Sequence, residues 1–358
     1  MGVNQQKIAV LCNYELLPER VGGMDYFYWM FDAKCKEQGI EVDWFFPNLS
    51  NHGSYSKLNL HSSGYKNVEN YFLENHSNNQ YSHVVTHFIE LCTPFYKKLK
   101  KINSAKIIAI DHNPRPLSGY PLKKRLEKKT KGILYAKYID LFVGVSDYTV
   151  NELLRDFGTS IKKKTITVYN GVILDDIKTH NERDFLSPKF LVASHLRKSK
   201  GIQDLIEAVA LLPKELKNKI KIDVYGDGPY KTSLLEKVKE CNVVNNFNFE
   251  GSKSNLKEIF CHYDYMLQPT YMECFSLSIL ESLAANVPVI TTNVGGNEEA
   301  VTNTVNGFIY KAKDYSALKV ILQKILLGEL KIIENTRTLI EDRFSLEKMV
   351  DNHIKLLQ

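Results

Sequence analysis

The amino-acid sequence predicts an α/β protein made of two domains, each built around a parallel sheet. A chain of 358 residues is too long for one ordinary core and suits two domains of roughly 150–180 residues. Strand and helix patterns alternate from end to end, as they do where helices connect the parallel strands of a sheet. The apolar content of 44% and the charged content of 25% are typical of a soluble globular protein.

The first predicted domain spans residues 1–172. An apolar run at 7–12 predicts its first strand, and a helix follows over about 24–38, ended by a glycine. The next strand is predicted at 40–46. Residues 48–80 are rich in Asn, Ser, His and Tyr, which indicates an extended loop with a short helix. Further strands are predicted at 83–86, 105–110, 141–145 and 165–168.

A second series of strands and helices begins after a polar segment. Residues 173–188 are polar and end in Ser-Pro, so we expect an interdomain linker there. The second domain is predicted at 189–340, and a last helix at 341–358 has Ser345 as its N-cap. The strands of the second domain are predicted near 190–194, 220–225, 247–250, 264–268, 287–292 and 307–310.

Positive charge is concentrated in the first half of the chain. Residues 1–172 hold 23 Lys and Arg against 16 Asp and Glu, whereas residues 173–358 hold 24 against 25. Such clusters indicate either contact with a polyanion or a solvated helix face. Since no aromatic residues are interleaved with the lysines, an acidic membrane surface is favoured over nucleic acid. The residues we expect at such a surface are Lys123, Lys124, Arg125, Lys128 and Lys129.

Several features indicate a cytoplasmic protein. The six cysteines are scattered singly, without the spacing of a zinc site, and are expected to be reduced thiols. No apolar run approaches the ~20 residues that span a bilayer, and the first residues lack a signal-peptide pattern. We therefore expect a cytoplasmic location, with peripheral attachment to the inner face of the membrane through the basic residues.

The most informative chemistry lies between two predicted strands, over residues 269–286. Glu273 is expected in the loop after a buried strand, and Glu281 eight positions later in the helix that follows. The start of that helix, at Phe275, Ser276 and Leu277, offers free backbone N–H groups and a positive dipole end to an anion. An anion site flanked by carboxylates suits a ligand with both phosphates and hydroxyls, such as a nucleotide-sugar.

This pattern resembles the Glu-x7-Glu signature of the retaining glycosyltransferases of family 4. These enzymes have the GT-B fold, in which two Rossmann-like parallel-sheet domains face each other across a cleft. The resemblance extends over nearly the whole chain and is strongest over 190–310. The other segments that carry it are 192–201, 224–229, 295–299, 21–25 and 168–172.

The resemblance implies donor-binding roles for the second domain. Lys200 would bind the donor diphosphate, whose negative charge grows as it leaves. The family usually places an arginine five residues earlier; here His195 stands there, so Arg197 or His195 would supply the second phosphate ligand. Glu273 would contact the transferred sugar and Glu281 the ribose hydroxyls. The remaining expected donor contacts are Gly22, Gly23, Gly251 and the backbone of Phe275, Ser276 and Leu277.

In the first domain the resemblance implies a catalytic histidine. His112 follows a buried strand and matches the family's active-site histidine beside the sugar. His87, Asp111 and Asn113 are candidates for the acceptor side of the site. We expect no metal and no cofactor, because Lys200, Arg197 and helix N-termini would neutralise the phosphates.

Taken together, these features predict a metal-independent hexosyltransferase of enzyme class EC 2.4 that uses a UDP- or GDP-sugar. The acceptor would be a lipid-linked or polysaccharide glycan in the synthesis of a cell-surface polysaccharide. One alternative is an epimerase or hydrolase of nucleotide-sugars on the same fold, and a non-enzymatic binding protein is another. A nicotinamide dehydrogenase is disfavoured because no Gly-x-Gly-x-x-Gly follows the first strand.

Overall fold

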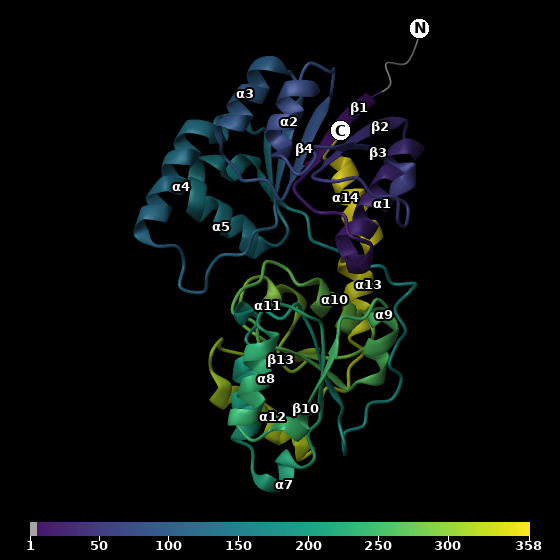
Figure 1. Cartoon of the computed structure of the whole chain (residues 1–358), viewed down its shortest axis with the longest axis vertical. Coiled ribbons are helices and arrows are strands. Elements are labelled where there is room, and N and C mark those ends of the chain that lie inside the picture. The colour runs from purple at the N-terminus through teal and green to yellow at the C-terminus, as the bar shows by residue number, and fades with distance from the viewer. Residues whose placement is uncertain (1–5) are drawn as a thin grey trace. The chain divides into compact units, whose positions relative to one another are not determined.

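The computed structural model describes residues 6–358 as two compact units (Figure 1). Residues 1–5, which begin the predicted first domain, lie outside the described residues. The first unit comprises residues up to 114, 118–170 and 346–358, and the second comprises 115–117 and 171–345. Strand and helix alternate in both units, as the sequence predicts.

The first unit is a seven-stranded parallel sheet in the order β3-β2-β1-β4-β5-β6-β7, with helices between the strands. Its last helix comes from the end of the chain, where Phe27 of the first helix packs against His353 at 4.7 Å between ring centroids. The elements are β1 (Gln6–Cys12), α1 (Gly23–Glu37), β2 (Ile40–Phe46), β3 (Asn59–Ser62), α2 (Val68–Asn75), β4 (His83–His87), α3 (Pro94–Ile102), β5 (Lys106–Asp111), α4 (Leu122–Tyr135), β6 (Leu141–Gly144), α5 (Asp147–Phe157), β7 (Thr165–Thr167) and α14 (Leu346–Lys355).

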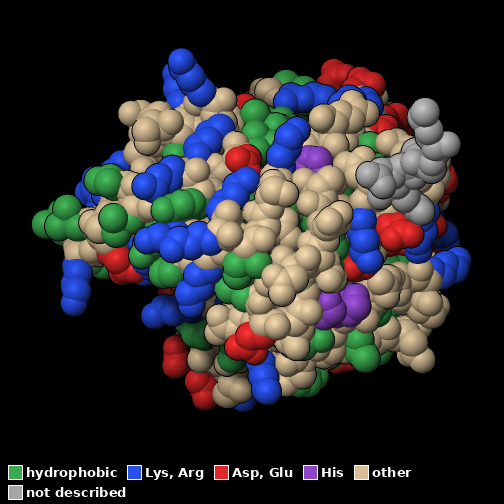
Figure 2. Space-filling view, turned by 90° about the horizontal axis from the view of Figure 1, so that it is seen from above, with side chains coloured by type: hydrophobic (Ala, Val, Ile, Leu, Met, Phe, Trp, Pro, Cys, Tyr) green, Lys and Arg blue, Asp and Glu red, His purple; other side chains and the backbone are tan. Residues whose placement is uncertain are grey.

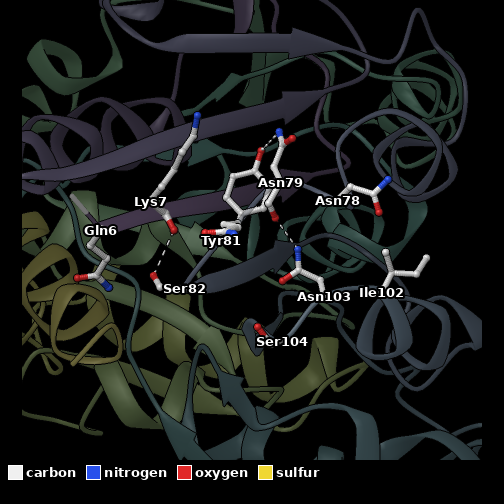
Figure 3. A pocket seen from close by; sticks show the side chains of 10 residues that line it. Gln6, Lys7, Asn78, Asn79, Tyr81, Ser82, Ile102, Asn103 and Ser104 are labelled. Carbon is white, nitrogen blue, oxygen red and sulfur yellow. Dashed lines mark hydrogen bonds between the residues drawn. The ribbon is translucent and has the colours of Figure 1, made fainter. Parts of the chain in front are cut away.

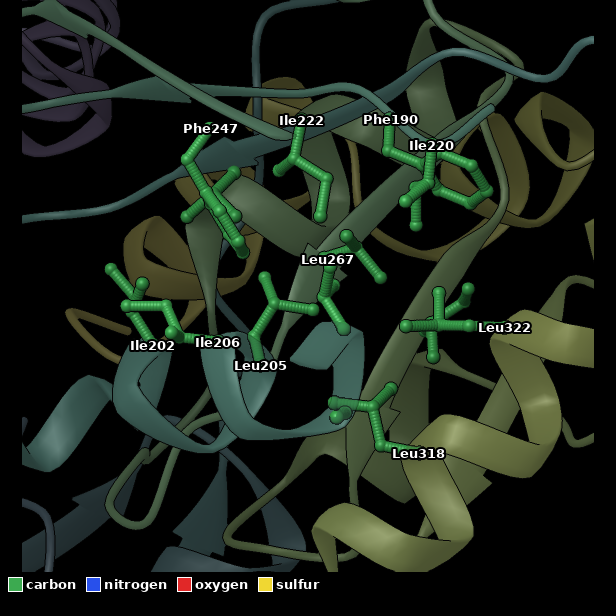
Figure 4. Close-up of a cluster of buried hydrophobic side chains, with 14 of the residues drawn as sticks. Phe190, Ile202, Leu205, Ile206, Ile220, Ile222, Phe247, Leu267, Leu318 and Leu322 are labelled. Carbon is green, nitrogen blue, oxygen red and sulfur yellow. The ribbon is translucent and has the colours of Figure 1, made fainter. Parts of the chain in front are cut away.

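The second unit is a six-stranded parallel sheet in the order β10-β9-β8-β11-β12-β13. Its core is a continuous cluster of aliphatic and aromatic side chains between the sheet and helices α6 and α12 (Figure 4). The elements are β8 (Phe190–Ala193), α6 (Ile202–Ala210), α7 (Lys214–Lys217), β9 (Ile222–Tyr225), α8 (Lys231–Glu240), β10 (Phe247–Gly251), α9 (Leu256–Ile259), β11 (Tyr265–Gln268), α10 (Leu277–Ala284), β12 (Val289–Thr292), α11 (Asn297–Ala300), β13 (Gly307–Tyr310), α12 (Tyr315–Leu326) and α13 (Arg337–Arg343).

Two segments differ from the sequence-based expectation. The stretch 48–80, expected as a loop with a short helix, also contains β3, which pairs in parallel with β2 at the sheet edge. Residues 173–188, expected as a linker, belong with the second unit. There the Arg183 guanidinium donates to the carbonyl oxygens of Ile332 at 2.8 Å and Asn286 at 2.9 Å. These bonds fix the segment because a buried guanidinium needs acceptors on several sides.

Both sheets are parallel, so the carboxyl ends of their strands lie along one edge of each sheet. Loops at that edge are where ligands bind in open α/β sheets. In the second unit the carboxyl ends of β8 and β11 are neighbours, since these two strands pair directly. In the first unit the carboxyl ends of β4 and β5 are neighbours in the same way.

Candidate active site

The loops that follow β8 and β11 are packed together backbone against backbone. Gly201 has φ +70°, and a Cβ atom there would lie 1.7 Å from the carbonyl oxygen of Pro269. The amide of Tyr271 donates to the carbonyl of Ser199 at 2.7 Å. Since no side chain fits at Gly201, this glycine allows the Lys200 turn to lie against the loop that carries Glu273.

A second glycine also packs against this loop. Gly295 has φ +63°, and a Cβ atom there would lie 2.0 Å from the carbonyl oxygen of Glu273. The amide of Gly296 donates to the carbonyl of Cys274 at 2.8 Å. The backbone at Glu273 is therefore fixed between two glycine turns that lie far from it in the sequence.

This packing brings Lys200 and Glu273 into direct contact. Lys200 Nζ lies 2.7 Å from Glu273 Oε2, and both side chains are partly exposed, at 22% and 16%. The sequence predicted both residues as ligands of the donor but did not predict that they bind each other. A phosphate bound at this edge would compete with the Glu273 carboxylate for Lys200.

Helix α10 begins beside this ion pair. Ser276 is its N-cap: the Ser276 hydroxyl accepts from the Ile279 amide at 3.4 Å and from Gln268 Nε2 at 2.6 Å. The amides of Leu277 and Ser278 stand in the first turn, where a helix supplies no acceptor for them. These amides and the helix dipole favour an anion.

Glu281 lies one turn into α10, four residues after Leu277 and so on the same face of the helix. Burial raises the pKa of the Glu281 carboxyl to about 7, against the opposing effect of the nearby Lys257 charge. No described residue within hydrogen-bonding distance satisfies this carboxyl. The Glu281 side chain is partly exposed, so a ligand can reach it, and a strongly shifted pKa is typical of groups at functional sites.

The other donor candidates of the second unit lie at the same edge of its sheet. Arg197 and His195 are both exposed in the turn after β8. Gly251 ends β10 with φ +73°, and its carbonyl accepts from the Gly226 amide at 2.8 Å. The ring of Phe275 is buried against Phe344, with 5.1 Å between centroids.

The first unit brings His87 and His112 together. His87 is the last residue of β4 and is paired with Ile110 of β5, so His112 follows two residues beyond that pair. His87 Nδ1 lies 3.0 Å from His112 Nε2. Burial lowers the pKa of His112 to about 3, although the charge of Asp111 opposes this effect, and burial also lowers the pKa of His87. Both rings are therefore neutral at neutral pH.

Asp111 and Asn113 form the turn that carries His112. Asp111 is buried at the end of β5, and its Oδ1 accepts from the backbone amide of Asn113 at 3.0 Å and from Asn113 Nδ2 at 3.2 Å. This oxygen of the Asp111 carboxylate therefore stabilises the turn that carries His112.

The glycine pair at the start of α1 is held by a carboxylate that is 1% exposed. Asp25 accepts from the amide of Gly22 at 3.0 Å, from the Tyr55 hydroxyl at 2.6 Å and from the Tyr14 hydroxyl at 3.1 Å. A Cβ atom at Gly22 would meet nothing closer than the Arg20 carbonyl at 3.7 Å. The fold alone does not require glycine at Gly22, which fits a surface that a ligand approaches closely. Gly23 is the first residue of α1.

A large hollow lies elsewhere on the first unit, at the amino ends of β1, β4 and β5 (Figure 3). It measures about 670 Å³ and is lined mainly by amide and hydroxyl side chains, among them Asn78, Gln80 and Ser104. It is on the opposite edge of the sheet from His112, so it is separate from the candidate active site.

The basic residues predicted for a membrane surface differ in their environments. Lys128 Nζ lies 3.0 Å from the buried carboxylate of Asp156, and Lys124 pairs with Glu127 at 3.0 Å. The ion pair with Asp156 leaves Lys128 less available to an anionic surface than the exposed cations of the same helix, and the membrane contact itself stays a prediction. Lys123, Arg125 and Lys129 are exposed.

The same helix also exposes large apolar side chains, which the sequence analysis did not single out. Leu122, Leu126 and Ile133 of α4 are 69%, 59% and 79% exposed. Their spacing of four and seven residues places them along one stripe of the helix. Figure 2 shows Lys and Arg side chains gathered with hydrophobic ones on the side of the first unit where α3 and α4 lie.

Residues 176–341 match the family model described as glycosyl transferases group 1. The match lies in the second unit of the chain. Two Rossmann-like units, each with a parallel sheet, are also the fold of the GT-B glycosyltransferases among its structural neighbours.

Individual relatives and solved structures are also similar to this chain. The N-acetyl-alpha-D-glucosaminyl L-malate synthase of Bacillus anthracis is 26% identical over 274 residues, which are 67% of this chain and 71% of that protein. Sucrose-phosphate synthase from Thermosynechococcus elongatus has the same fold, with a TM-score of 0.79, 17% identity and 98% of each chain covered. HepE of Anabaena, solved in complex with UDP, aligns with a TM-score of 0.73 and 15% identity over 98% of this chain and 99% of that one.

Substituting alanine at Gly201 or Gly295 will destabilise the second unit by about 2–4 kcal/mol, because the new Cβ meets backbone oxygen and the positive φ disfavours alanine. Gly22→Ala is the matched control, since a Cβ fits there, and its thermal midpoint should stay within the error of the native protein. Chemical denaturation checks these values. If the Gly295→Ala variant were as stable as the native protein, this would contradict the packing described for Glu273.

The raised pKa of Glu281 predicts a pH-dependent stability. A carboxyl whose pKa is near 7 when folded and about 4.5 when unfolded destabilises the fold as it ionises, so stability is lost as pH rises through this range. Glu281→Gln should therefore be more stable than the native protein at pH 8, by about 1–3 kcal/mol, and the gain should shrink at pH 5.5. Denaturation curves at both pH values test this. If Glu281→Gln changed the free energy of unfolding equally at pH 8 and pH 5.5, ionisation of Glu281 would not be the cause of the change.

Proposed function

We propose that this chain is a retaining glycosyltransferase of the family 4 type, which moves a sugar from a nucleoside-diphosphate sugar to an acceptor hydroxyl. The observation that carries the proposal is the Lys200–Glu273 contact beside the open first turn of α10. A cation and free amides suit a leaving diphosphate, and carboxylates suit sugar hydroxyls, because each carboxylate oxygen accepts more than one hydrogen bond.

We infer that the donor is a UDP-sugar. HepE was solved with UDP and also with UDP-glucose, which supports uridine as the base. In this assignment Lys200 and the amides of Leu277 and Ser278 bind the diphosphate, with Arg197 as a second cation. Glu281 accepts from the ribose hydroxyls, and Glu273 holds the transferred sugar once the phosphate has drawn Lys200 away. No resident metal or cofactor takes part in this scheme.

We assign His112 of the first unit to the acceptor side of the reaction. Its neutral imidazole can donate or accept one hydrogen bond to an acceptor hydroxyl without adding charge beside an anionic leaving group. The leaving phosphate oxygen then takes the acceptor's proton as the new glycosidic bond forms and the bond from sugar to phosphate breaks.

We propose that the acceptor is a lipid-linked glycan in the synthesis of a surface polysaccharide, used at the inner face of a membrane. No helix within residues 6–358 is long and apolar enough to cross a bilayer. The α4 stripe of Leu122, Leu126 and Ile133 beside Lys123 and Arg125 supports peripheral attachment instead. Leucines beside exposed cations are the pattern of a helix lying in an anionic lipid surface.

A transfer assay tests the enzymatic proposal. With UDP-sugar and a glycan acceptor, release of UDP should depend on the acceptor, persist in EDTA and fall at least 100-fold in Glu273→Gln. Glu298→Gln, near the same edge, serves as a matched control. Turnover of the donor without any acceptor would favour the alternative of an epimerase or hydrolase and would contradict transfer.

Vesicle sedimentation tests the membrane surface. Binding to vesicles with about one third anionic lipid should fall roughly 100-fold when Lys123, Arg125 and Lys129 become Gln, at about 1 kcal/mol for each charge removed. Leu126→Asp should also weaken binding, although its helix remains folded. The same charge change at the exposed Lys214, Lys219 and Lys239 of the second unit should have little effect. Equal losses in both triple variants would rule out a specific surface on α4.

A further inference from the structure

Tyr271 connects the two segments that carry Lys200 and Glu273. It lies in the loop after β11, two residues before Glu273. Its amide donates to the carbonyl of Ser199, and its Cε1 atom lies 3.2 Å from the position that a Cβ atom would take at Gly201. Tyr271 therefore contacts the chain on both sides of Lys200.

The hydroxyl of Tyr271 adds a side-chain bridge to the same turn. Gln203, in the first turn of α6, donates through Nε2 to the carbonyl of Lys198 at 3.0 Å and to the Tyr271 hydroxyl at 2.9 Å. A carbonyl oxygen can only accept, so the bond to Lys198 identifies the donor as the amide nitrogen of Gln203. The Tyr271 hydroxyl accepts the second bond and keeps its own proton for another partner.

That partner is the carboxylate of Asp204, also in the first turn of α6. Burial, and then the hydrogen bond to Asp204, raise the pKa of the Tyr271 hydroxyl well above its usual value. Burial also raises the pKa of the Asp204 carboxyl, and the bond from Tyr271 opposes this effect. Because a hydroxyl carries one proton, the bonds run in one direction, from Gln203 to Tyr271 to Asp204.

The bridge lies beside the ion pair and outside the main core. Tyr271 is half-buried and does not belong to the hydrophobic cluster between the sheet and helices α6 and α12. Lys313 Nζ lies 5.6 Å from the centroid of its ring. The polar contacts of Tyr271 therefore act on the Lys200 turn and the start of α6 rather than on the packing of the unit.

We propose that Tyr271 is a positioning residue for the donor diphosphate: its hydroxyl, bonded to Gln203 and Asp204, keeps the Lys200 turn against the Glu273 loop and so keeps Lys200 where the phosphates bind. The effect on the donor rests on the function proposed above for Lys200. The position of the Lys200 side chain can be measured without any donor, so the two parts can be tested separately.

UDP affinity, measured by titration calorimetry, tests whether Tyr271 acts through Lys200. Tyr271→Phe should weaken UDP binding about 5–10-fold in the native protein and leave it within a factor of about two in Lys200→Met. Gln203→Met breaks the same bridge and should weaken binding similarly; it provides the test if Tyr271→Phe does not fold. Equal losses in the native and Lys200→Met backgrounds, or no loss in either, would overturn the proposal.

Tyr263→Phe is the matched control for lost stability. The Tyr263 hydroxyl also donates to a carboxylate, that of Asp223 at 2.6 Å, but it lies before the start of β11 rather than after its end. Tyr263→Phe and Tyr271→Phe should both lower the thermal midpoint, whereas only Tyr271→Phe should weaken UDP binding. An equal loss of UDP affinity in Tyr263→Phe would overturn the proposal, because lost stability would then explain both.

The crystal structure of Tyr271→Phe without a donor tests the positioning itself. Lys200 Nζ should lie within hydrogen-bonding distance of Glu273 in the native protein and should leave this position in the variant. An unchanged contact between Lys200 and Glu273 in Tyr271→Phe would overturn the proposal. If the native protein bound no UDP, the proposed function would fail, while a displaced Lys200 in the variant would still support the positioning role of Tyr271.

Discussion

The close contact of backbone with backbone at Gly201 and Gly295 is the constraint on which the candidate active site depends. Each glycine has positive φ and leaves no space for a side chain against the loop that follows β11. A side chain at Gly201 would collide with the carbonyl of Pro269, and a side chain at Gly295 would collide with the carbonyl of Glu273. The ion pair, the start of α10 and Glu281 all take their positions from this packing.

Much of the fold could be predicted from the sequence because its strands are buried on both faces of parallel sheets. Buried strands are nearly continuous apolar runs, and all of those expected were found within a few residues. β3 was missed because it is an edge strand of four residues, Asn59–Ser62, with polar and half-exposed side chains. Its residues carry no alternation of apolar and polar positions, so only the pairing with β2 defines it.

The individual site residues could be named from motifs, whereas their contacts could not. Lys200 and Glu273 are 73 residues apart, and the hydrogen bond between them follows from glycine packing that no local pattern encodes. The environment of Lys128 could not be predicted either. In the sequence Lys128 is part of a run of cations, but in the structure it pairs with the buried Asp156. The sequence did contain one unused signal: Gly201 directly follows Lys200, as a tight turn requires.

In the proposed reaction, the ionisable groups of the first unit and those of the second unit are in different charge states. His112 and His87 are kept neutral by burial, while Glu281 is poised to titrate near neutral pH. The donor side thus uses charge, through Lys200 and the carboxylates, and the acceptor side uses an uncharged hydrogen-bonding ring. The exposed leucines and cations of α4 belong to neither set of groups, and in our proposal they determine where the protein binds a membrane rather than how it reacts.

The central claim is that Lys200 binds the donor diphosphate in exchange for its contact with Glu273. Titration calorimetry of UDP and UMP against the native protein and Lys200→Met tests this claim most directly. Loss of one charge-assisted hydrogen bond should weaken UDP binding about 10–100-fold, while UMP, which lacks the second phosphate, should bind both proteins within a factor of about two. Equal UDP affinity in the native protein and Lys200→Met would contradict the account.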